Sequence, residues 1–234
     1  MKLIPAIFNN IKKRHTAIIG MTRSGKTYFA KHVIKDLQAE GFHTLFVDPK
    51  REIDEEMGTV CTTPMQVYSQ LIAKNPAIVF HPTAGSQERA EELTKVVDIV
   101  FKLVDKDGFK RIKRIVAIDE IQTFVRKGIH DGIDQLWLVG AGKGIMGMAL
   151  TQRLQNMNET VWSQSENKII FKIDDRGEYL RTRNLDHYNQ QLDFFRSPEN
   201  QFWFYATNGS GKWRRHKPIG AGTLKPPKRL RLSR

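Results

Sequence analysis

Short apolar runs recur along the chain and are separated by longer polar or amphipathic segments. Nearly every residue of each run is apolar, without the polar alternation that is typical of a strand with one solvent-exposed face. Runs of this kind suit the central strands of a parallel sheet, because helices bury both faces of such strands. The predicted strands are 16–19, 44–47, 77–80, 115–118, 146–150 and 168–173, followed by an aromatic strand at 202–205.

Apolar residues at helical spacing fill the segments between these runs. Phe29, Val33 and Leu37 form one such set, in which residues four positions apart share a helix face. The predicted helices are 26–38, a second helix within 86–104, a third at 159–165 and a short one after Asp134. Alternating strands and helices predict an α/β fold, with a mainly parallel central sheet flanked by helices and extra strands near the C-terminus.

The composition narrows the class of protein. A chain of 234 residues fits one large domain or two small ones. With 40% hydrophobic and 27% charged residues, the chain is of the globular type, which excludes collagen-like, low-complexity and wholly disordered proteins. Because no interdomain linker interrupts the pattern, residues 1–211 are predicted to form a single domain and residues 212–234 a basic, flexible tail.

Cysteine content and hydropathy exclude further classes. Cys61 is the single cysteine, so the chain cannot form an intrachain disulfide or a thiolate zinc cluster, and a reducing compartment is favoured. The N-terminal residues, interrupted by Pro5 and followed by cations at 12–14, lack the apolar core and cleavage site of a signal peptide. No stretch approaches about 18 apolar residues, so no transmembrane segment is predicted.

Positive charge is concentrated at the C-terminal end. The formal net charge is +13, and no acidic residue follows Glu199. A basic segment broken by Pro and Gly suits the phosphate backbone of nucleic acid, which it would bind through counterion release without reading sequence. The alternatives are a solvated tail, an acidic protein partner or, less favoured, anionic lipid. The candidate DNA-binding residues are Lys212, Arg214, Arg215, Lys217, Lys225, Lys228, Arg229 and Arg231.

Residues 20–27 match the pattern G-x-x-x-x-G-K-[ST] at every fixed position, between a predicted strand and a predicted helix. In such a loop the glycines let consecutive backbone N–H groups face phosphates, the Lys reaches the β- and γ-phosphates, and the Ser or Thr holds Mg²⁺. The alternative is a glycine turn that caps an ordinary helix. The candidate nucleotide-binding residues are Gly20, Met21, Thr22, Arg23, Ser24, Gly25, Lys26 and Thr27.

Two carboxylates, Asp119 and Glu120, directly follow the apolar strand at 115–118. We predict that Asp119 lies beside Mg²⁺ and that Glu120 polarises the attacking water, because phosphoryl transfer to water needs charge neutralisation and an oriented nucleophile. Taken alone, such a pair could equally cap a helix. Together with the loop it predicts hydrolysis of a nucleoside triphosphate, with the loop and the carboxylates on adjoining strands.

Two further strand ends carry candidate or ambiguous residues. Gln152 follows the strand at 146–150, and since the carboxyl ends of parallel strands line the ligand crevice, we expect it near the γ-phosphate, or else as a surface residue. Asp48, after the strand at 44–47, is either a site carboxylate or a turn residue before Pro49. The aromatic strand at 202–205 is interpreted as core packing in preference to a base-stacking platform.

In combination these residues resemble the FtsK-HerA superfamily of DNA-pumping ATPases. The motifs that carry the resemblance are the phosphate loop, Phe46-Val47-Asp48-Pro49-Lys50, Ile118-Asp119-Glu120 and Thr151-Gln152-Arg153, within residues 16–205. Because the chain is small, with no appended membrane domain, it is most similar to the genome-packaging ATPases of tailless viruses that have an internal membrane.

The resemblance implies a RecA-like P-loop NTPase core that assembles into a ring, usually a hexamer, and moves double-stranded DNA through a central pore. ATP and Mg²⁺ are the implied cofactors, with Lys26 and Thr27 on the nucleotide and metal, Asp119 on the metal, Glu120 as the activator of water and Gln152 as the sensor. It further implies packaging of a viral genome into a preformed capsid, a capsid or membrane-vertex protein as docking partner, and a location in the host cytoplasm or at a virion packaging vertex.

Relatives also insert an arginine from the neighbouring subunit, about two dozen residues after the acidic pair. At that position this chain has Lys143, which carries a point charge where arginine presents a planar fork. The residue that a neighbouring subunit would insert, here called the finger, is therefore not decided by the sequence. The candidates are Lys143, Arg153, Arg126 and Arg183. Two alternative functions also stay open: a cellular HerA-type translocase or helicase in repair, and a non-motor phage assembly NTPase.

Overall fold

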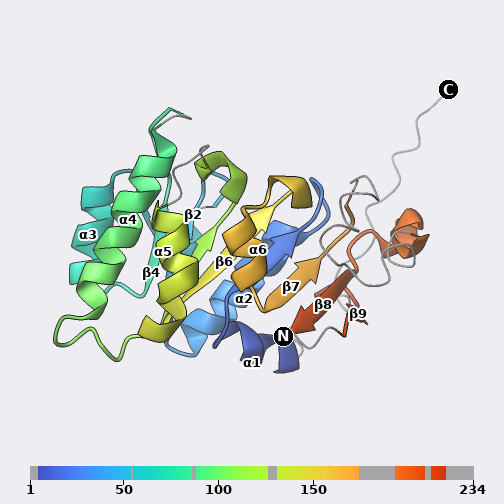
Figure 1. Ribbon diagram of the computed structural model, residues 1–234, viewed down its shortest axis with the longest axis horizontal. Coiled ribbons are helices and arrows are strands. Elements are labelled where there is room, and N and C mark those ends of the chain that lie inside the picture. The colour runs from blue at the N-terminus through green and yellow to red at the C-terminus, as the bar shows by residue number, and fades with distance from the viewer. Residues whose placement is uncertain are drawn as a thin grey trace.

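One continuous sheet organises the protein. The computed structural model describes residues 5–53, 55–85, 88–125, 131–173, 193–208 and 212–219. Within them, nine strands form the sheet in the order β3-β4-β2-β5-β6-β1-β7-β8-β9 (Figure 1). The strands are β1 Thr16–Ile19, β2 His43–Val47, β3 Thr59–Cys61, β4 Ala77–Phe80, β5 Arg114–Ile118, β6 Ile145–Thr151, β7 Asn167–Ile170, β8 Phe204–Asn208 and β9 Arg214–His216.

Most of the sheet is parallel. The strands from β3 to β7 in this order pair in parallel, whereas β8 and β9 are antiparallel additions. The predicted α/β class, mainly parallel sheet and C-terminal addition are confirmed. The expectation that the loop strand and the carboxylate strand adjoin is wrong, because β6 pairs with both β1 and β5. All seven residues of β6 are buried, as suits a central strand.

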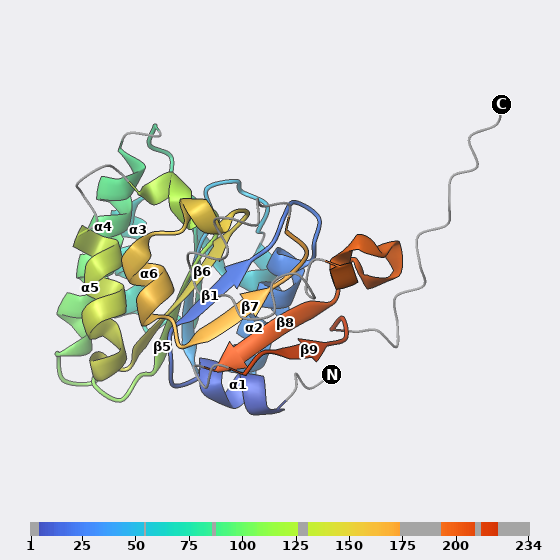
Figure 2. The same ribbon diagram turned by 45° about the vertical axis from the view of Figure 1, so that its right-hand side comes forward.

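Helices cover both faces of the sheet (Figures 1 and 2). They are α1 Pro5–Ile11, α2 Lys26–Ala39, α3 Pro64–Ile72, α4 Arg89–Val104, α5 Asp131–Val139 and α6 Glu159–Gln164. Apolar residues of α3, α4, α5 and α6 share one hydrophobic cluster with one face of the strands. Residues of α1 and α2 share a second cluster with the other face. The strands are therefore covered on both sides, which explains why their sequences are continuously apolar.

Alternate strand residues supply the two clusters. In β1, Ala17 and Ile19 face the α4 side while Ile18 faces α2. In β5, Val116 faces the α4 side while Ile115 faces α2. Every second side chain of a strand therefore points to the same face. Because the central strands are parallel, their carboxyl ends emerge together at one edge of the sheet, where they can position polar residues.

The predicted elements differ from the observed ones mainly near the C-terminal strands. The strand expected at 168–173 ends at Ile170, although the next residues still bond to the segment that ends β1: the Phe171 N–H donates to Ile19 O at 2.8 Å, and Lys172 O accepts the Met21 N–H at 2.8 Å. The strand expected at 202–205 is β8 and starts only at Phe204.

Two short elements at the β3 edge were not predicted. Strand β3 has three residues, too few for a visible apolar run. Helix α3 carries a start signal that could have been recognised: Thr63 and Gln66 form a capping box, and Pro64 occupies the first turn. Short elements with mixed composition give weak periodicity, so their end signals are more informative than their apolar spacing.

Strand β9 lies inside the segment that was expected to be a flexible tail. Arg214, Arg215 and His216 pair with β8. Their charges are tolerated there because β9 is an edge strand. The division into a domain at 1–211 and a tail stays a prediction, since residues 220–234 lie outside the described part of the chain. In that described part, none of the helices combines the length and apolarity needed to cross a membrane.

Candidate active site

The candidate site lies where β1, β2, β5 and β6 end. These parallel strands send their carboxyl ends to one edge of the sheet, so the segments that follow them meet there. The segment after β1 is the predicted phosphate loop, and Asp119 with Glu120 follows β5. Gln152 follows β6, and Lys50 follows β2.

The loop at 20–27 is tightly curled and anchored on both sides. The Gly20 N–H donates to Thr151 O at 3.1 Å and the Met21 N–H donates to Lys172 O at 2.8 Å. A side chain at Gly20 would have its Cβ 2.4 Å from Ser24 Oγ, so glycine is required there. Gly25 has φ 100°, a left-handed conformation that also favours glycine.

Helix α2 begins at this loop and leaves donors for a ligand. Its N-cap Gly25 provides no side-chain cap, so the first N–H groups and the positive end of the helix dipole remain available to an anion. The buried hydroxyl of Ser24 has no hydrogen-bond partner in the described structure. Lys26 is 5% exposed and directs its ammonium toward Glu120. The loop therefore has the charge and donors expected of a phosphate site.

Glu120 lies at the centre of the site. It is 1% exposed, and its backbone has φ 46°, which is unusual for a residue with a side chain. Oε1 accepts from Lys50 Nζ, with which it forms an ion pair, and from Gln152 Nε2 at 2.7 Å; Oε2 accepts from Gln122 Nε2 at 2.5 Å. Burial raises the pKa of Glu120, but these hydrogen bonds outweigh it, so the pKa lies below its usual value and the group is ionised.

Gln152 connects the loop to this carboxylate. Its Oε1 accepts from Thr22 Oγ1 at 3.2 Å, while its Nε2 donates to Glu120. The neighbouring Thr151 donates to Gln122 Oε1 at 2.8 Å and so links the ends of β6 and β5. The amide is therefore placed where a change in the phosphate loop can reach the carboxylate.

Asp119 fits a metal-binding role. It is 1% exposed, and Oδ1 accepts the Glu120 N–H at 2.9 Å while Oδ2 is buried without a hydrogen-bond partner in the described structure. An unpaired buried carboxylate oxygen is costly unless a cation or donor satisfies it. Thr27 follows Lys26 in the first turn of α2. The pair Thr27 and Asp119 supplies the oxygen ligands that Mg²⁺ prefers.

Replacing Asp119 with Asn is expected to stabilise the protein in the absence of nucleotide, by on the order of 1–3 kcal/mol at pH 7.5. Burial raises the pKa of Asp119 to about 6 from 3.8, although Lys26 opposes part of this rise. A raised folded-state pKa gives stability that is present below pH 3.8 and is lost as the pH rises through about 6. Asn carries no charge at any of these pH values, so the variant does not lose this stability as the pH rises.

Urea unfolding at pH 5 and pH 7.5 checks this expectation. The advantage of Asp119→Asn over wild type should be larger at pH 7.5, whereas the exposed control Asp107→Asn should show no such difference. An equal advantage of Asp119→Asn at both pH values would contradict the burial of an ionised, unpaired carboxylate.

Lys50 and Asp48 occupy the end of β2. Asp48 is fully buried and accepts the Lys50 N–H at Oδ1 (2.9 Å) and the Ile53 N–H at Oδ2 (2.7 Å). His81 Nε2 lies 3.6 Å from Oδ2. Of the two interpretations left open for Asp48, the structure therefore supports a turn residue. Lys50 was not predicted as a site residue, although it belongs to the strand-end motif and follows the same edge rule as Gln152.

The candidate finger residues do not gather in this site. Lys143 precedes β6, at the opposite edge of the sheet from the loop, and its Nζ lies 2.5 Å from Asp105 Oδ2. Arg153 follows Gln152, is exposed and starts a short 3₁₀ turn. Arg126 and Arg183 lie outside the described residues. A role for Lys143 would therefore require a neighbouring subunit.

Next to the candidate site, a cavity of about 220 Å³ lies beside the first turn of α2. Most of its walls are apolar, and Gly25 of the loop is one of its lining residues: a Cβ there would be 3.4 Å from a ring atom of Phe202. Phe202 is 41% exposed, whereas Phe204 is 1% exposed. The expected core packing is thus confirmed for Phe204 and wrong for Phe202, which precedes the strand. The other lining residues are Tyr28, Phe29, Phe171, Pro218 and Ile219.

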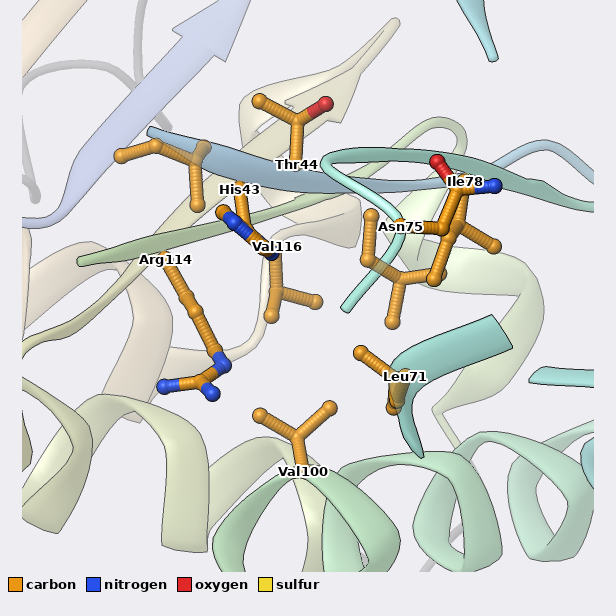
Figure 3. Close-up of a pocket in the computed structure, with 10 residues that line it drawn as sticks. His43, Thr44, Leu71, Asn75, Ile78, Val100, Arg114 and Val116 are labelled. Atoms are coloured by element: carbon orange, nitrogen blue, oxygen red, sulfur yellow. The ribbon is translucent and has the colours of Figure 1, made fainter. Parts of the chain in front are cut away.

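A smaller cavity lies near the amino ends of β2 and β5, at the other end of the strands from the candidate site. His43 and Arg114 line it on the strand side, and helices α3 and α4 line it on the other (Figure 3). Its volume is about 10 Å³, room for no more than about one water molecule. The Arg114 guanidinium donates to Ile112 O at 2.8 Å. The cavity is therefore a packing feature rather than a ligand site.

The described part of the basic segment lies along the β9 edge. Arg214 and Arg215 are exposed on this strand, with Lys212 before it and Lys217 after it. The Arg215 guanidinium stacks over the ring of Phe194, 4.2 Å from its centroid. The edge therefore presents several exposed cations, and an aromatic ring holds one of them. The remaining candidates, Lys225, Lys228, Arg229 and Arg231, lie outside the described residues.

Solved structures share this fold. The genome-packaging NTPase B204 of Sulfolobus turreted icosahedral virus 2, in complex with AMPPCP, has a TM-score of 0.70 at 19% identity, over 89% of this chain and 99% of that chain. B204 of Sulfolobus turreted icosahedral virus, a DNA-packaging ATPase, gives 0.70 at 21% identity, over 88% and 98%. VirB4 of Thermoanaerobacter pseudethanolicus gives 0.66 at 12%, over 88% and 89%.

Sequence comparison identifies the family. No curated protein matches the chain, but the family model described as the central domain of helicase HerA matches residues 5–203. This match includes the loop, both carboxylates, Lys50 and Gln152. The protein therefore belongs to the HerA central-domain family of FtsK-HerA P-loop ATPases.

Proposed function

We propose that this protein hydrolyses ATP to move double-stranded DNA, and that its task is to package a viral genome into a preformed capsid. The observation that carries the proposal is the chain of contacts from Thr22 of the loop through Gln152 to Glu120. It connects the position of a bound phosphate to the group that would activate water. Such a connection is what a motor needs to couple nucleotide state to a mechanical step.

In the proposed reaction, different residues of this chain bind the phosphates, accept the proton and orient the reacting groups. Lys26 and the N–H groups at the start of α2 bind the phosphates, and Glu120 accepts the proton of the attacking water. Gln152 orients that water or the γ-phosphate. A magnesium ion, which Thr27 and Asp119 would hold, supplies positive charge against the phosphate oxygens.

We place the nucleobase in the aromatic cavity beside Gly25. The cavity adjoins the loop, and the rings of Tyr28 and Phe202 are 44% and 41% exposed, unlike the buried rings of the core. Exposed rings next to a phosphate site offer a stacking surface for a base. The carbon-rich walls favour stacking over reading of the base edge.

The β9 edge is the proposed DNA contact. Its arginines are exposed and lie on an edge strand, where they can follow a phosphate backbone without reading bases. A packaging motor needs such a sequence-independent grip, since every part of a genome must pass. The stacking of Arg215 on Phe194 fixes one of these guanidinium groups and lowers the entropy lost on binding.

A ring of subunits, most simply a hexamer, is part of this proposal. Lys143 would then reach the nucleotide of a neighbouring subunit. In support, Leu138 and Val139, at the end of α5 near Lys143, are 61% and 48% exposed. Apolar side chains left in solvent suit a contact between subunits.

Packaging is favoured over repair because both B204 proteins are named as packaging enzymes and match nearly their whole length. In that setting the motor would work in the host cytoplasm, docked on a capsid or membrane-vertex protein. A HerA-type translocase in repair is the second candidate, and its support is that the matching family is described as the central domain of helicase HerA. The two candidates share the chemistry proposed here and differ in the partner that docks the motor.

The test is the rate of ATP hydrolysis with and without duplex DNA at low salt. Wild type should be stimulated, whereas the double variant Arg214→Gln/Arg215→Gln should keep its DNA-free rate and lose most of the stimulation. Its DNA affinity should also fall less steeply with salt, by about one unit of slope for each phosphate that the variant no longer neutralises.

A matched control removes two charges elsewhere. Lys102→Gln/Lys106→Gln, both on or directly after α4 and exposed, should leave stimulation unchanged. The absence of stimulation in wild type, together with no DNA binding at low salt, would reject the motor. Loss of stimulation in both double variants would reject β9 as the specific contact.

A further inference from the structure

Three donors compete for one oxygen of the central carboxylate. Oε1 of Glu120 pairs with Lys50 Nζ, accepts from Gln152 Nε2 at 2.7 Å and lies 3.7 Å from Lys26 Nζ. The Glu120 and Lys26 side chains are 2% and 6% exposed, whereas Lys50 is 36% exposed. The carboxylate is therefore shared between a buried lysine of the loop and a more exposed lysine from β2.

The position of Lys50 is built into the end of β2. The buried carboxylate of Asp48 accepts the Lys50 N–H and, five residues along from Asp48, the Ile53 N–H, which fixes the turn that carries Lys50. The Asp119 N–H donates to Val47 O at 2.9 Å and so joins the end of β5 to the end of β2. The backbone of Lys50 is thus held against the strand that carries Glu120.

The pairing of Lys50 with Glu120 matters because an ion pair between Lys26 and Glu120 would block the proposed roles of both residues. Lys26 and Glu120 attract each other, and in a buried environment an ion pair between them would be strong. If Lys26 were bound to Glu120, it could not bind phosphate, and Glu120 could not accept a proton from water. A second cation on the same carboxylate oxygen weakens the hold of Glu120 on Lys26.

We propose that Lys50 is a positioning residue that competes with Lys26 for the same oxygen of Glu120, so that Lys26 can be released to phosphate while the carboxylate stays ionised and directed at water. The inference rests on the proposed role of Glu120 and extends it to a residue outside the phosphate loop and the acidic pair. When phosphate binds, Lys26 leaves Glu120 and Lys50 is the lysine that remains paired with it. Lys50 therefore acts on both nucleotide affinity and turnover.

The proposal is tested with Lys50→Met and Lys50→Arg. In Lys50→Met, Glu120 should turn to Lys26, so the affinity for magnesium ATPγS and the kcat for ATP should each fall about tenfold. Lys50→Arg keeps the positive charge and should restore both to within about threefold of wild type. Lys35→Met, which removes an exposed lysine paired with Glu56, is the matched control and should change neither value.

A double-variant cycle with Glu120→Gln separates positioning from a merely structural role. Gln carries no charge to capture Lys26, so adding Lys50→Met to Glu120→Gln should leave nucleotide affinity within about twofold. The same tenfold loss in that background would overturn the proposal, and so would wild-type affinity and kcat in Lys50→Met alone. If Lys50→Met does not fold, Lys50→Gln replaces it in the same comparisons.

The outcomes also distinguish this inference from the proposed function. Wild-type turnover in Glu120→Gln would remove Glu120 as the activator of water, whatever Lys50 does. Loss of turnover in Glu120→Gln with normal behaviour of Lys50→Met would leave the proposed function intact and reject only the role of Lys50.

Discussion

Replacing Glu120 with Gln is expected to lower ATP turnover about 10²- to 10⁴-fold while nucleotide affinity stays within about threefold of wild type. The amide keeps the size of the side chain and can still accept a hydrogen bond from Lys50, but it cannot take a proton from water. The phosphate loop and Asp119 are untouched, so binding should survive. Rates from single-turnover experiments, with affinity from titration of magnesium ATPγS, check both parts.

The hydrogen bonds of Glu120 explain why this substitution should change turnover more than binding. The side chain is buried and accepts hydrogen bonds on both oxygens. Gln keeps its shape, and its oxygen can still accept from Lys50 and Gln152, while its NH2 group faces Gln122, whose amide must turn over to accept from it. Glu40→Gln, at an exposed ion pair with Lys12, removes a carboxylate outside the site and should keep full activity. If Glu120→Gln lost as much affinity as a variant of the loop lysine, the assignment of the carboxylate would be wrong.

Replacing Lys26 with Ala is expected to weaken nucleotide binding itself, by about 10- to 100-fold, and to reduce turnover with it. Lys26 carries the loop's buried ammonium, and Ala provides neither the charge nor the donors for phosphate oxygens. Its loss also leaves Glu120 without one of its two neighbouring cations. Calorimetric titration with magnesium ATPγS measures the change.

The control for this variant lies on the same helix. Lys31 is on α2 and donates to the backbone of Glu52 at 3.3 Å in an exposed position. Lys31→Ala should bind nucleotide as wild type does, because it is outside the loop. Equal weakening in both variants would point to a general effect on α2 and would contradict a phosphate contact by Lys26.

Much of the site could be predicted because a parallel sheet brings its carboxyl ends together. Once β1, β5 and β6 are read as strands, the residues that follow them must lie at one edge, which places the loop, Glu120 and Gln152 near one another. The residue types then narrow the chemistry, since a glycine-rich loop with Lys26 has few uses other than phosphate binding.

Other features depend on contacts that no local pattern specifies. The order of the strands, which inserts β6 between β1 and β5, is decided by packing between distant segments. Lys50 obeys the strand-end rule that identified Gln152, but it stands three residues beyond the end of β2, and its contact with Glu120, 70 positions along the chain, depends on the turn at Asp48. The exposure of Phe202 depends on where β8 begins, and an aromatic run does not define that boundary.

The central claim is that the loop and the carboxylates form one nucleotide site, and titration of magnesium ATPγS into the wild-type protein tests it most directly. We predict saturable binding at one site per chain, weakened by Lys26→Ala and preserved by Glu120→Gln and Lys31→Ala. Absence of binding to the wild type, or binding that Lys26→Ala leaves unchanged, would contradict the account.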